Sequence, residues 1–323
     1  MGIFVLLSAA LLVVLLLALA VGSESISIFE MSDQQRAILL DIRMPRVFLG
    51  ACVGACLAVA GASLQALLRN PLAEPNIVGV GPGAVLGAVI VFMSGLALRS
   101  ALALPFAAFV GALLALAVIY TLATRGGVTP ISTLLLSGIA MGALLGAVSS
   151  LLISLSIINW QVAQEILFWS MGGLDSRTWT HVWISAPFII FAGGLSLYYA
   201  RDLDLIMQGE ETAAALGVDV ESSKRVIMVV AALLTGTSVA VAGTIGFVGL
   251  IVPHVVRLFV GPAHRALIPA SCLTGAAFLI FCDLLARTLH PPTEIRLGII
   301  TAAFGAPFFL FLLARKFREV KTL

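Results

Sequence analysis

The sequence RNPLAEPNIVGVGPGA (residues 69–84) separates two long apolar stretches of the chain. Closely spaced prolines break it, and three polar side chains, Arg69, Asn70 and Glu74, lie beside them. In a soluble protein this segment would be an ordinary surface loop. In a membrane protein it would mark the point where the chain leaves the lipid, with its backbone available for contacts. The composition of the whole chain decides between these two interpretations.

The composition is that of a membrane protein. Apolar residues make up 61% of the 323 residues and charged residues 11%, with a mean hydropathy of +1.14, whereas soluble domains have about 45–50% and about 25%. The net charge is +2, and the lysines and arginines are spread along the sequence rather than clustered. That distribution leaves no basic patch for nucleic acid. The sequence therefore predicts an all-α, polytopic protein whose surroundings are membrane lipid.

The cysteines indicate neither a metal site nor a disulfide framework. Cys52, Cys56, Cys272 and Cys282 all lie in apolar stretches and show no CxxC spacing. Cys52 and Cys56 share a helix face, and we interpret them as small packing residues. We therefore expect no metal site and no cofactor bound by this chain.

Apolar segments long enough to cross a membrane recur along the chain. A helix rises about 1.5 Å per residue, so about 20 apolar residues cross a hydrocarbon core of about 30 Å. We interpret the first segment as a retained span rather than a signal peptide, because it lacks a basic n-region. By this criterion the sequence predicts about ten transmembrane helices, near residues 3–22, 46–68, 76–95, 101–124, 131–156, 180–200, 225–243, 245–261, 266–287 and 297–314.

The predicted span over residues 245–261 is short and carries Pro253, His254 and Arg257. A proline removes one helix hydrogen bond, which neighbouring groups must replace. This pattern predicts a broken or re-entrant helix that is surrounded by protein rather than by lipid. A single bent segment over residues 225–261 is the alternative.

The distribution of basic residues predicts the orientation. The C-terminal stretch ARKFREVKTL (314–323) carries four basic residues, which the positive-inside rule places in the cytoplasm. With an even number of spans the N-terminus is cytoplasmic as well. Eleven of the 18 lysines and arginines then fall on the inner side. We therefore expect both termini in the cytoplasm.

All the tryptophans lie within residues 160–183. Indole rings prefer the interface between membrane and water. Residues 157–179 are therefore predicted to form an interfacial element on the outer face, between the fifth and sixth spans. A plain aromatic belt with no further role is the alternative.

The sequence lacks the residues for two kinds of catalysis. A nucleotide-hydrolysing P-loop needs Gly-Lys followed by Ser or Thr, and none of the three lysines follows a glycine. His254 has no serine partner in a GxSxG setting, and Asp283 and Arg287 have the spacing of a local ion pair. We therefore expect no catalytic residues and no enzyme activity, with ATP hydrolysed by a separate partner.

An ion-coupled secondary transporter is the alternative from a different class. Such carriers need ionisable groups or unwound helices near the midplane, whereas the predicted mid-span positions are almost wholly apolar. The inner loop MQGEETAAALGVDV (207–220) favours translocation that is driven from outside the membrane domain. Residues 210–216 have helical propensity and Gly217 takes the C-cap position. We expect a short helix that docks against a soluble ATPase, with a solvated loop helix as the alternative.

Seven segments carry a resemblance to a known family, and these are RMPRVFLG (43–50), AGASLQALLRNPLAEPNIVGVGPGA (60–84), FWSMGGLDSRTW (168–179), GEETAAALGV (209–218), GFVGLIVPHVVRLFVGPAHR (246–265), DLLARTL (283–289) and GIITAAFGAPFFLFLL (298–313). Over essentially its whole length the chain closely resembles the transmembrane subunits of type II ABC importers, the FecCD-like permeases for ferric siderophores, haem and vitamin B12.

The resemblance implies a single transmembrane permease domain over residues 1–323, with the ten-helix type II ABC importer permease fold. It also implies three kinds of partner in a bacterial inner membrane. They are a second permease copy, which makes a homodimer, a cytoplasmic ABC ATPase dimer that holds ATP and Mg²⁺, and a periplasmic or lipid-anchored substrate-binding protein.

The resemblance places a cytoplasmic gate at two loops. Asn70 and Leu72 correspond to one part of the gate, where the flanking prolines hold a short non-helical turn. A rigid helix-capping turn is the alternative interpretation. The loop VTPIST (128–133) resembles the second part and contributes Thr129, Ser132 and Thr133. It departs from the family in its proline and isoleucine, where relatives often have small polar residues.

The loop over residues 207–220 resembles the coupling helices that contact the ATPase. The residues that this resemblance assigns to coupling are Gly209, Glu211, Ala213, Leu216 and Gly217.

Three arginines correspond to a docking surface for the binding protein on the outer face. Arg43 and Arg46 match family arginines that meet acidic residues, and Arg287 joins them from the end of the ninth span. Such pairs set docking orientation and association rate more than affinity. The alternative is that Arg43 and Arg46 merely flank the second span. Arg296 stands where relatives commonly have proline, and the sequence assigns it no role.

The resemblance implies an iron chelate, either a ferric siderophore or haem, as the substrate, with cobalamin as the alternative within the family. Arg177 is a candidate contact for anionic groups of such a ligand. His181 and His290 are candidates for meeting a metal chelate near the outer face, with interfacial polar residues as the alternative. The binding protein supplies selection in this family, so the sequence itself carries little information on specificity.

Overall fold

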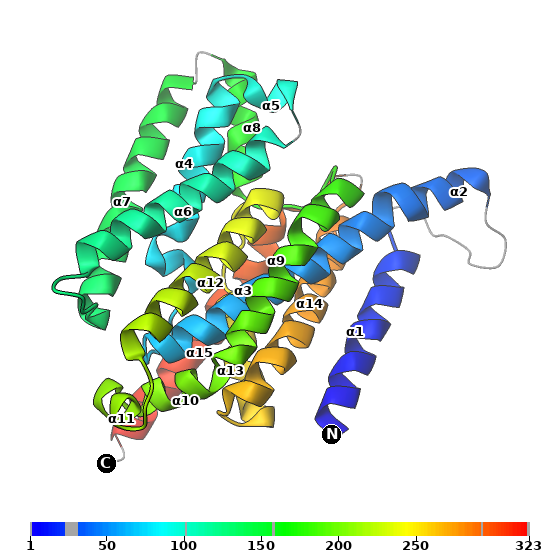
Figure 1. Cartoon of the computed structure of the whole chain (residues 1–323). Helices are drawn as coiled ribbons and strands as arrows, with labels where there is room; N and C mark the ends of the chain where they lie inside the picture. Colours follow the sequence, from blue (N-terminus) through cyan, green and yellow to red (C-terminus); the bar gives the residue numbers. More distant parts are fainter. Residues whose placement is uncertain (1, 23–31, 101, 157–158, 292, 322–323) are drawn as a thin grey trace.

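The computed structural model describes residues 2–22, 32–100, 102–156, 159–291 and 293–321. The chain is 82% helical, and the described residues form no β-strand (Figure 1). In chain order the elements are α1 (Gly2–Ala20), α2 (Asp33–Ala37), the π-helix η1 (Ile38–Arg43), α3 (Met44–Leu67), the 3₁₀-helix η2 (Pro75–Val78), α4 (Val80–Met93), α5 (Leu96–Arg99), α6 (Ala103–Ala123), α7 (Ile131–Ser156), α8 (Trp160–Ser170), α9 (Trp179–Tyr198), α10 (Ala200–Gln208), α11 (Glu210–Ala215), α12 (Val220–Ala242), α13 (Val248–Val260), α14 (His264–Thr288) and α15 (Leu297–Lys321).

Each predicted span coincides with a helix, namely α1, α3, α4, α6, α7, α9, α12, α13, α14 and α15. Among the described residues, seven helices are long and apolar enough to cross a membrane. The apolar parts of α4, α13 and α15 are shorter. The all-α, multi-pass architecture is confirmed, while the exact number of crossings stays a prediction.

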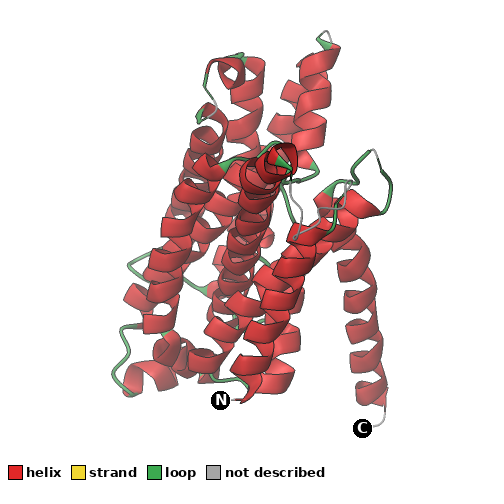
Figure 2. Ribbon diagram, turned by 90° about the vertical axis from the view of Figure 1, so that its right-hand side faces the viewer, coloured by secondary structure: helices red, strands yellow, loops and turns green. Residues whose placement is uncertain are grey.

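The helices define two ends of the molecule. α11, the beginning of α1 and the end of α15 lie together at the lower end of Figure 1, which we call the α11 end. The short helices α5 and α8 lie at the opposite, upper end, which we call the α8 end. In the perpendicular view most long helices run roughly along one common direction (Figure 2). The beginning of α1 and the end of α15 therefore lie at the same end as the predicted coupling helix.

α3 forms the centre of the bundle, where it packs against α9, α12, α13 and α14. Glycines let two of these neighbours come close. A Cβ atom at Gly54 would collide with the backbone of Gly275 on α14, and one at Gly61 would collide with the backbone of Gly249 on α13. Without a hydrophobic driving force inside lipid, such close backbone packing holds helices together. These glycines therefore allow α13 and α14 to approach the backbone of α3 closely.

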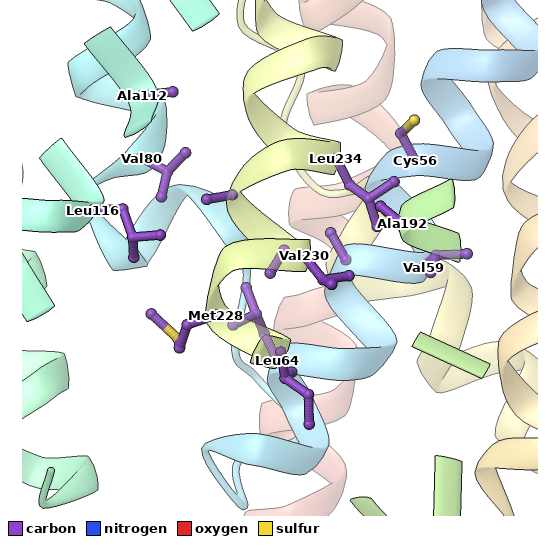
Figure 3. Close-up of a cluster of buried hydrophobic side chains, with 14 of the residues drawn as sticks. Cys56, Val59, Leu64, Val80, Ala112, Leu116, Ala192, Met228, Val230 and Leu234 are labelled. Carbon is purple, nitrogen blue, oxygen red and sulfur yellow. The ribbon is translucent and has the colours of Figure 1, made fainter. Parts of the chain in front are cut away.

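Apolar side chains fill the space between α3, α4, α6 and α12. Leu64 on α3 and Met228 and Leu234 on α12 are almost completely buried and belong to this cluster (Figure 3). By contrast, few side chains of α1 and α7 are buried, although both helices are strongly apolar. An apolar helix with an exposed surface fits a lipid environment or a further subunit.

The chain does not break at Pro253, which corrects the expectation of a helix broken at this proline, whereas a re-entrant path stays a prediction. α13 continues through this proline, and the break lies earlier, between α12 and α13 at residues 243–247. Pro253 has no N–H for the carbonyl of Gly249 one turn before. The side-chain amide of Gln65 replaces that donor, at 3.2 Å from the oxygens of Gly249 and Leu250. Pro253 is buried, as expected for a helix surrounded by protein.

The predicted interfacial element between the fifth and sixth spans includes α8. Trp169 on this helix is buried and meets Phe92 edge-on, with ring centroids 6.3 Å apart. Trp179 begins α9, stacks near Trp183 at 6.3 Å and donates a hydrogen bond to the carbonyl of Leu40. The tryptophans therefore do more than form a belt, because they also pack the α8 end together.

Candidate functional site

The first predicted gate segment follows α3 directly. Arg69 has a left-handed backbone with φ 47°, so the N–H of Asn70 reaches back to the carbonyl of Gln65 at 3.1 Å and closes the helix end. The side-chain oxygen of Asn70 then accepts the N–H of Leu72 at 3.0 Å. Asn70 and Leu72 are thus joined in one tight turn, and both are half-buried.

Glu74 ties this segment to the beginning of α13. Its carboxylate accepts the backbone N–H of Phe247 at 2.6 Å and the amide of Asn76 at 3.4 Å. Burial raises the pKa of Glu74 above its usual range, and the hydrogen bond from Phe247 acts in the opposite direction. Phe247 has a left-handed backbone, with φ 67°. The sequence analysis assigned no role to Glu74, although a carboxylate between two prolines in an apolar chain is a visible signal.

The same segment then folds against α7. η2 packs against this helix, and a Cβ atom at Gly79 would lie 3.1 Å from the carbonyl oxygen of Gly138. Gly79 has φ 79°, which favours glycine. Thus η2, which follows the first predicted gate segment, contacts α7, the helix that carries the end of the second predicted gate segment.

The second predicted gate segment (128–133) begins at Val128, which closes a turn with Arg125 through two hydrogen bonds. Thr129 is 1% exposed, and its hydroxyl lies 2.9 Å from that of Thr124 and 3.2 Å from that of Tyr120.

Ser132 and Thr133, the remaining predicted gate residues, are exposed on the first turn of α7. The hydrogen bonds found among the described residues do not join Asn70 or Leu72 to Thr129. The gate roles stay predictions.

A buried lysine connects the second gate segment with the predicted coupling helix. The amine of Lys224 on α12 lies 2.6 Å from Glu210, 2.9 Å from Glu221 and 3.0 Å from the carbonyl oxygen of Thr129. We call these four residues the Lys224 cluster. The sequence analysis missed it, although Lys224 is the one lysine outside the C-terminal tail and Glu221 stands three residues before it.

The predicted coupling helix is α11, and it ends as expected. Gly217 has φ 86°, and the N–H groups of Gly217 and Val218 bond to the carbonyls of Ala214 and Ala213, which is the glycine-dependent helix stop. Glu211 and Leu216 are exposed, whereas Ala213 is completely buried within the chain. Gly209 is the N-cap residue directly before the helix, with φ 130°. The surface of α11 open to a partner thus includes Glu211 and Leu216.

At the α8 end, Arg46 sits in a compact ionic network. Its guanidinium lies 2.8 Å from a carboxylate oxygen of Asp283 and 2.8 Å from one of Glu294. The side chain of Asp283 is 3% exposed, and its predicted pair with Arg287 is present at 3.7 Å. Arg46 therefore binds carboxylates within its own chain.

Arg43 and Arg287 close the end of α1. Arg43 donates to the carbonyls of Leu19 and Ala20 at 3.1 and 3.2 Å, and Arg287 donates to that of Ala18. The last carbonyls of a helix lack partners within the helix, and cations are favourable there. A cavity of about 300 Å³ opens beside the three arginines. No sequence pattern indicated this capping role, and docking to a binding protein stays a prediction.

A second cavity at this end, of about 290 Å³, is lined by Glu165, Phe168, Asp175, Arg177 and Arg296, among others. Arg296 pairs with Asp175 at 3.1 Å and lies 4.5 Å above the ring of Phe168, which gives this residue a contact that the sequence could not assign. The Nε atom of Arg177 is buried and has no hydrogen-bond partner among the described residues. Burial lowers the pKa of Arg177, and Asp175 opposes this shift.

The two candidate histidines have local partners. The ring of His181 accepts the N–H of Thr178 at 3.3 Å at the start of α9, and His290 lies 2.6 Å from the hydroxyl of Thr293. In the part of the chain that the structure describes, His, Cys, Asp and Glu do not gather in groups of three or more that could hold a metal ion.

Comparison with known proteins decides the family. The sequence profile of the FecCD transport family matches residues 10–315, which is almost the whole chain. The chain belongs to the FecCD transport family.

Curated FecCD relatives are similar over most of their length. The cobalamin import system permease protein BtuC of Halobacterium salinarum is 46% identical over 91% of this chain and 78% of its own. The hemin transport system permease protein HmuU of Yersinia pestis is 39% identical over 94% of both chains. The Fe(3+) dicitrate transport system permease protein FecD of Escherichia coli is 40% identical over 86% of this chain and 85% of its own.

A solved structure has the same fold. It is described as an inward-facing conformation of a metal-chelate type ABC transporter, and it matches with a TM-score of 0.88 and 30% identity over 96% of this chain and 97% of that one. The FecCD chain is therefore a permease subunit of an ABC transporter. Such a subunit implies an ATPase and a substrate-binding partner.

Proposed function

We propose that the chain is the membrane permease of an ATP-driven importer for an iron chelate, either a ferric siderophore or haem. The observation that carries this proposal is the family match over residues 10–315. Relatives named for hemin and for ferric dicitrate transport share 39% and 40% identity with the chain. An ion-coupled carrier that works alone is not favoured by these similarities.

The α11 end is proposed to face the cytoplasm and to meet the ATPase dimer, which binds ATP and Mg²⁺. The exposed Glu211 and Leu216 on α11 support this contact. Gly209 and Gly217 bound the helix, and Ala213 fixes it to the rest of the chain by burial. The basic C-terminal stretch belongs to the same end, as the positive-inside rule expects for a bacterial inner membrane. Both termini are then cytoplasmic.

Two chain segments near this end are proposed to form the cytoplasmic gate. One contains Asn70 and Leu72 in their tight turn, and the other contains Thr129, Ser132 and Thr133. The support is that η2 packs on α7, so the first segment is connected to the helix that carries Ser132. A shift of α7 would therefore displace both gate segments.

The α8 end is proposed to receive the binding protein, and the long exposed surface of α7 is proposed to take part in a homodimer. The cavity beside Arg43, Arg46 and Arg287 supports docking of acidic side chains, because three guanidinium groups line it with a single carboxylate. Arg177, with its unpartnered Nε in the neighbouring cavity, is proposed to contact anionic groups of the ligand.

Cobalamin is the second candidate substrate. A specific observation favours it, since the cobalamin permease of Halobacterium salinarum is 46% identical to the chain. A transport assay that offers both ligand classes decides between them.

The test is uptake by proteoliposomes that contain the chain together with its ATPase and binding protein. Iron supplied as a ferric siderophore, haem and cobalamin are offered in parallel vesicles, with and without ATP inside. We expect ATP-dependent accumulation of an iron chelate. ATP-dependent uptake of cobalamin alone would move the assignment to the second candidate. Uptake that persists without ATP and collapses with a protonophore would overturn the importer itself.

A further inference from the structure

We propose that Lys224 is a positioning residue that links the ATPase-facing helix α11 to the gate segment before α7. The inference rests on the proposed function, because it assigns a route by which movement of α11 reaches the gate. The proposed link lies within one chain. It joins α11, to which coupling was assigned, and the loop before α7, to which gating was assigned.

The Lys224 cluster joins three separate pieces of the chain. Glu210 belongs to the first turn of α11, Glu221 and Lys224 belong to the first turns of α12, and Thr129 belongs to the loop between α6 and α7. The amine of Lys224 has an oxygen from each piece within 3.0 Å. An ammonium group has three donors, so the three contacts use them all.

Glu221 doubles the connection to the gate segment. One of its carboxylate oxygens accepts from Lys224 at 2.9 Å, and the other accepts the N–H of Thr129 at 3.1 Å. The backbone of Thr129 is thus held at both its N–H and its carbonyl. The hydroxyl of Thr129 is in turn bonded to Tyr120 and Thr124 at the end of α6. The turn before α7 therefore cannot shift freely relative to Lys224.

Burial makes this connection stiff. The side chain of Lys224 is 3% exposed, while those of Glu210 and Glu221 are 31% and 24% exposed. A buried charge that loses a partner is strongly destabilised, so Lys224 is expected to follow Glu210 rather than separate from it when α11 moves. The neighbouring bond between Ser223 and Asp202, at 2.9 Å, connects the same turn of α12 to α10.

The first measurement is uptake per ATP hydrolysed, with the complete transporter in proteoliposomes. Glu210→Gln removes the charge that joins α11 to Lys224 and leaves the contacts of Lys224 with Glu221 and Thr129 in place. We expect it to lower uptake per ATP about tenfold, within the usual range for a coupling free energy between sites, while ATP hydrolysis continues. Lys224→Met should give the same defect, and Lys224→Arg should recover part of the uptake because it keeps the charge.

Arg225→Met is the matched control. Arg225 is the next residue on α12, carries the same charge and is exposed, so its loss should leave uptake per ATP unchanged. Copurification of the ATPase with each variant shows whether the complex still assembles. If Lys224→Met fails to assemble, Glu210→Gln carries the test, because its lysine keeps two partners.

The outcomes separate the two proposals. A Glu210→Gln variant that assembles and transports with the normal uptake per ATP would overturn the link, even though the wild type imports a chelate. A parallel fall of uptake and ATP hydrolysis, with an unchanged ratio, would also overturn it and assign the cluster to stability alone. Absence of ATP-dependent uptake in the wild type would instead refute the proposed function.

Discussion

At the scale of single residues, buried charged side chains form ion pairs with other residues of the same chain. Arg46 is the clearest example, because its guanidinium is almost enclosed and binds Asp283 and Glu294. A residue that the family resemblance assigns to docking thus also neutralises a carboxylate that is 3% exposed. Any loss of docking in a variant at this position must be separated from loss of stability.

Arg46→Met should therefore destabilise the folded permease strongly. It leaves Asp283 buried with only the more distant Arg287, and breaking a buried ion pair costs about 3–5 kcal/mol. The measurement is thermal unfolding in detergent. Arg296→Met is the control, because its partner Asp175 is half exposed, and such pairs contribute about 1 kcal/mol or less. Equal losses for the two variants would contradict the assignment of a buried network.

Glu74 gives a second prediction at this scale. Glu74→Ala leaves the N–H of Phe247 without its acceptor, and an unsatisfied buried donor costs about 1–3 kcal/mol. Glu74→Gln keeps an acceptor oxygen and should lose much less. Thermal unfolding of both variants checks this ranking. If alanine and glutamine were equally stable, the hydrogen bond would not be what holds the segment to α13.

At the scale of elements, α13 shows how a neighbouring helix permits a proline in the interior. The carbonyl of Gly249 lacks its usual donor because residue 253 is proline, and Gln65 on α3 supplies one. Arg257, one turn after the proline, donates to the oxygen of the same Gln65 amide at 3.3 Å. One side chain of α3 therefore orients two parts of α13.

A double-mutant cycle tests this arrangement. Gln65→Leu should destabilise the protein by about 1–3 kcal/mol, because buried carbonyls lose their donor. In a Pro253→Ala background the new N–H can bond to Gly249, so the cost of Gln65→Leu should fall by about 1 kcal/mol. Unfolding of the four proteins gives the coupling. Purely additive effects would show that Gln65 does not serve the proline.

At the scale of the whole molecule, the α11 end and the α8 end lie on opposite sides of the bundle and carry different charged groups (Figure 1). The α11 end carries the exposed side chains of Glu211 and Leu216 and the Lys224 cluster. The α8 end carries the arginine cavities and α8 itself. A permease that crosses the membrane should present these ends to different compartments.

Site-directed labelling tests that topology. Val128→Cys lies in the exposed turn between α6 and α7, and Gln164→Cys lies on the exposed face of α8. A membrane-impermeant maleimide added to intact cells should label Gln164→Cys alone, and both should react after the membrane is opened. Labelling of both from outside would contradict the proposed orientation, whereas the unsubstituted chain corrects for its own cysteines.

The family resemblance predicted the gate, coupling and arginine segments, and the structure places them at the α11 end and the α8 end of the bundle. The helix stop at Gly217 and the ion pair of Asp283 with Arg287 were predictable because both depend on residues close in sequence. The gate, coupling and docking roles stay predictions, since they concern partners and movements. The contacts of Lys224 with Thr129 and of Glu74 with Phe247 were not predictable, because these partners are 95 and 173 residues apart in the sequence.

The sequence by itself determined the class of the protein and the position of its helices. Apolar stretches and their polar breaks are local properties, and a helix satisfies its backbone within its own segment, so hydropathy places helices without knowledge of their neighbours. Only the tertiary structure decided which helices touch, that α13 passes through Pro253, and that buried charges such as Lys224 and Arg46 find their partners inside the chain. Those outcomes depend on glycine contacts and hydrogen bonds between distant segments, which no local pattern contains.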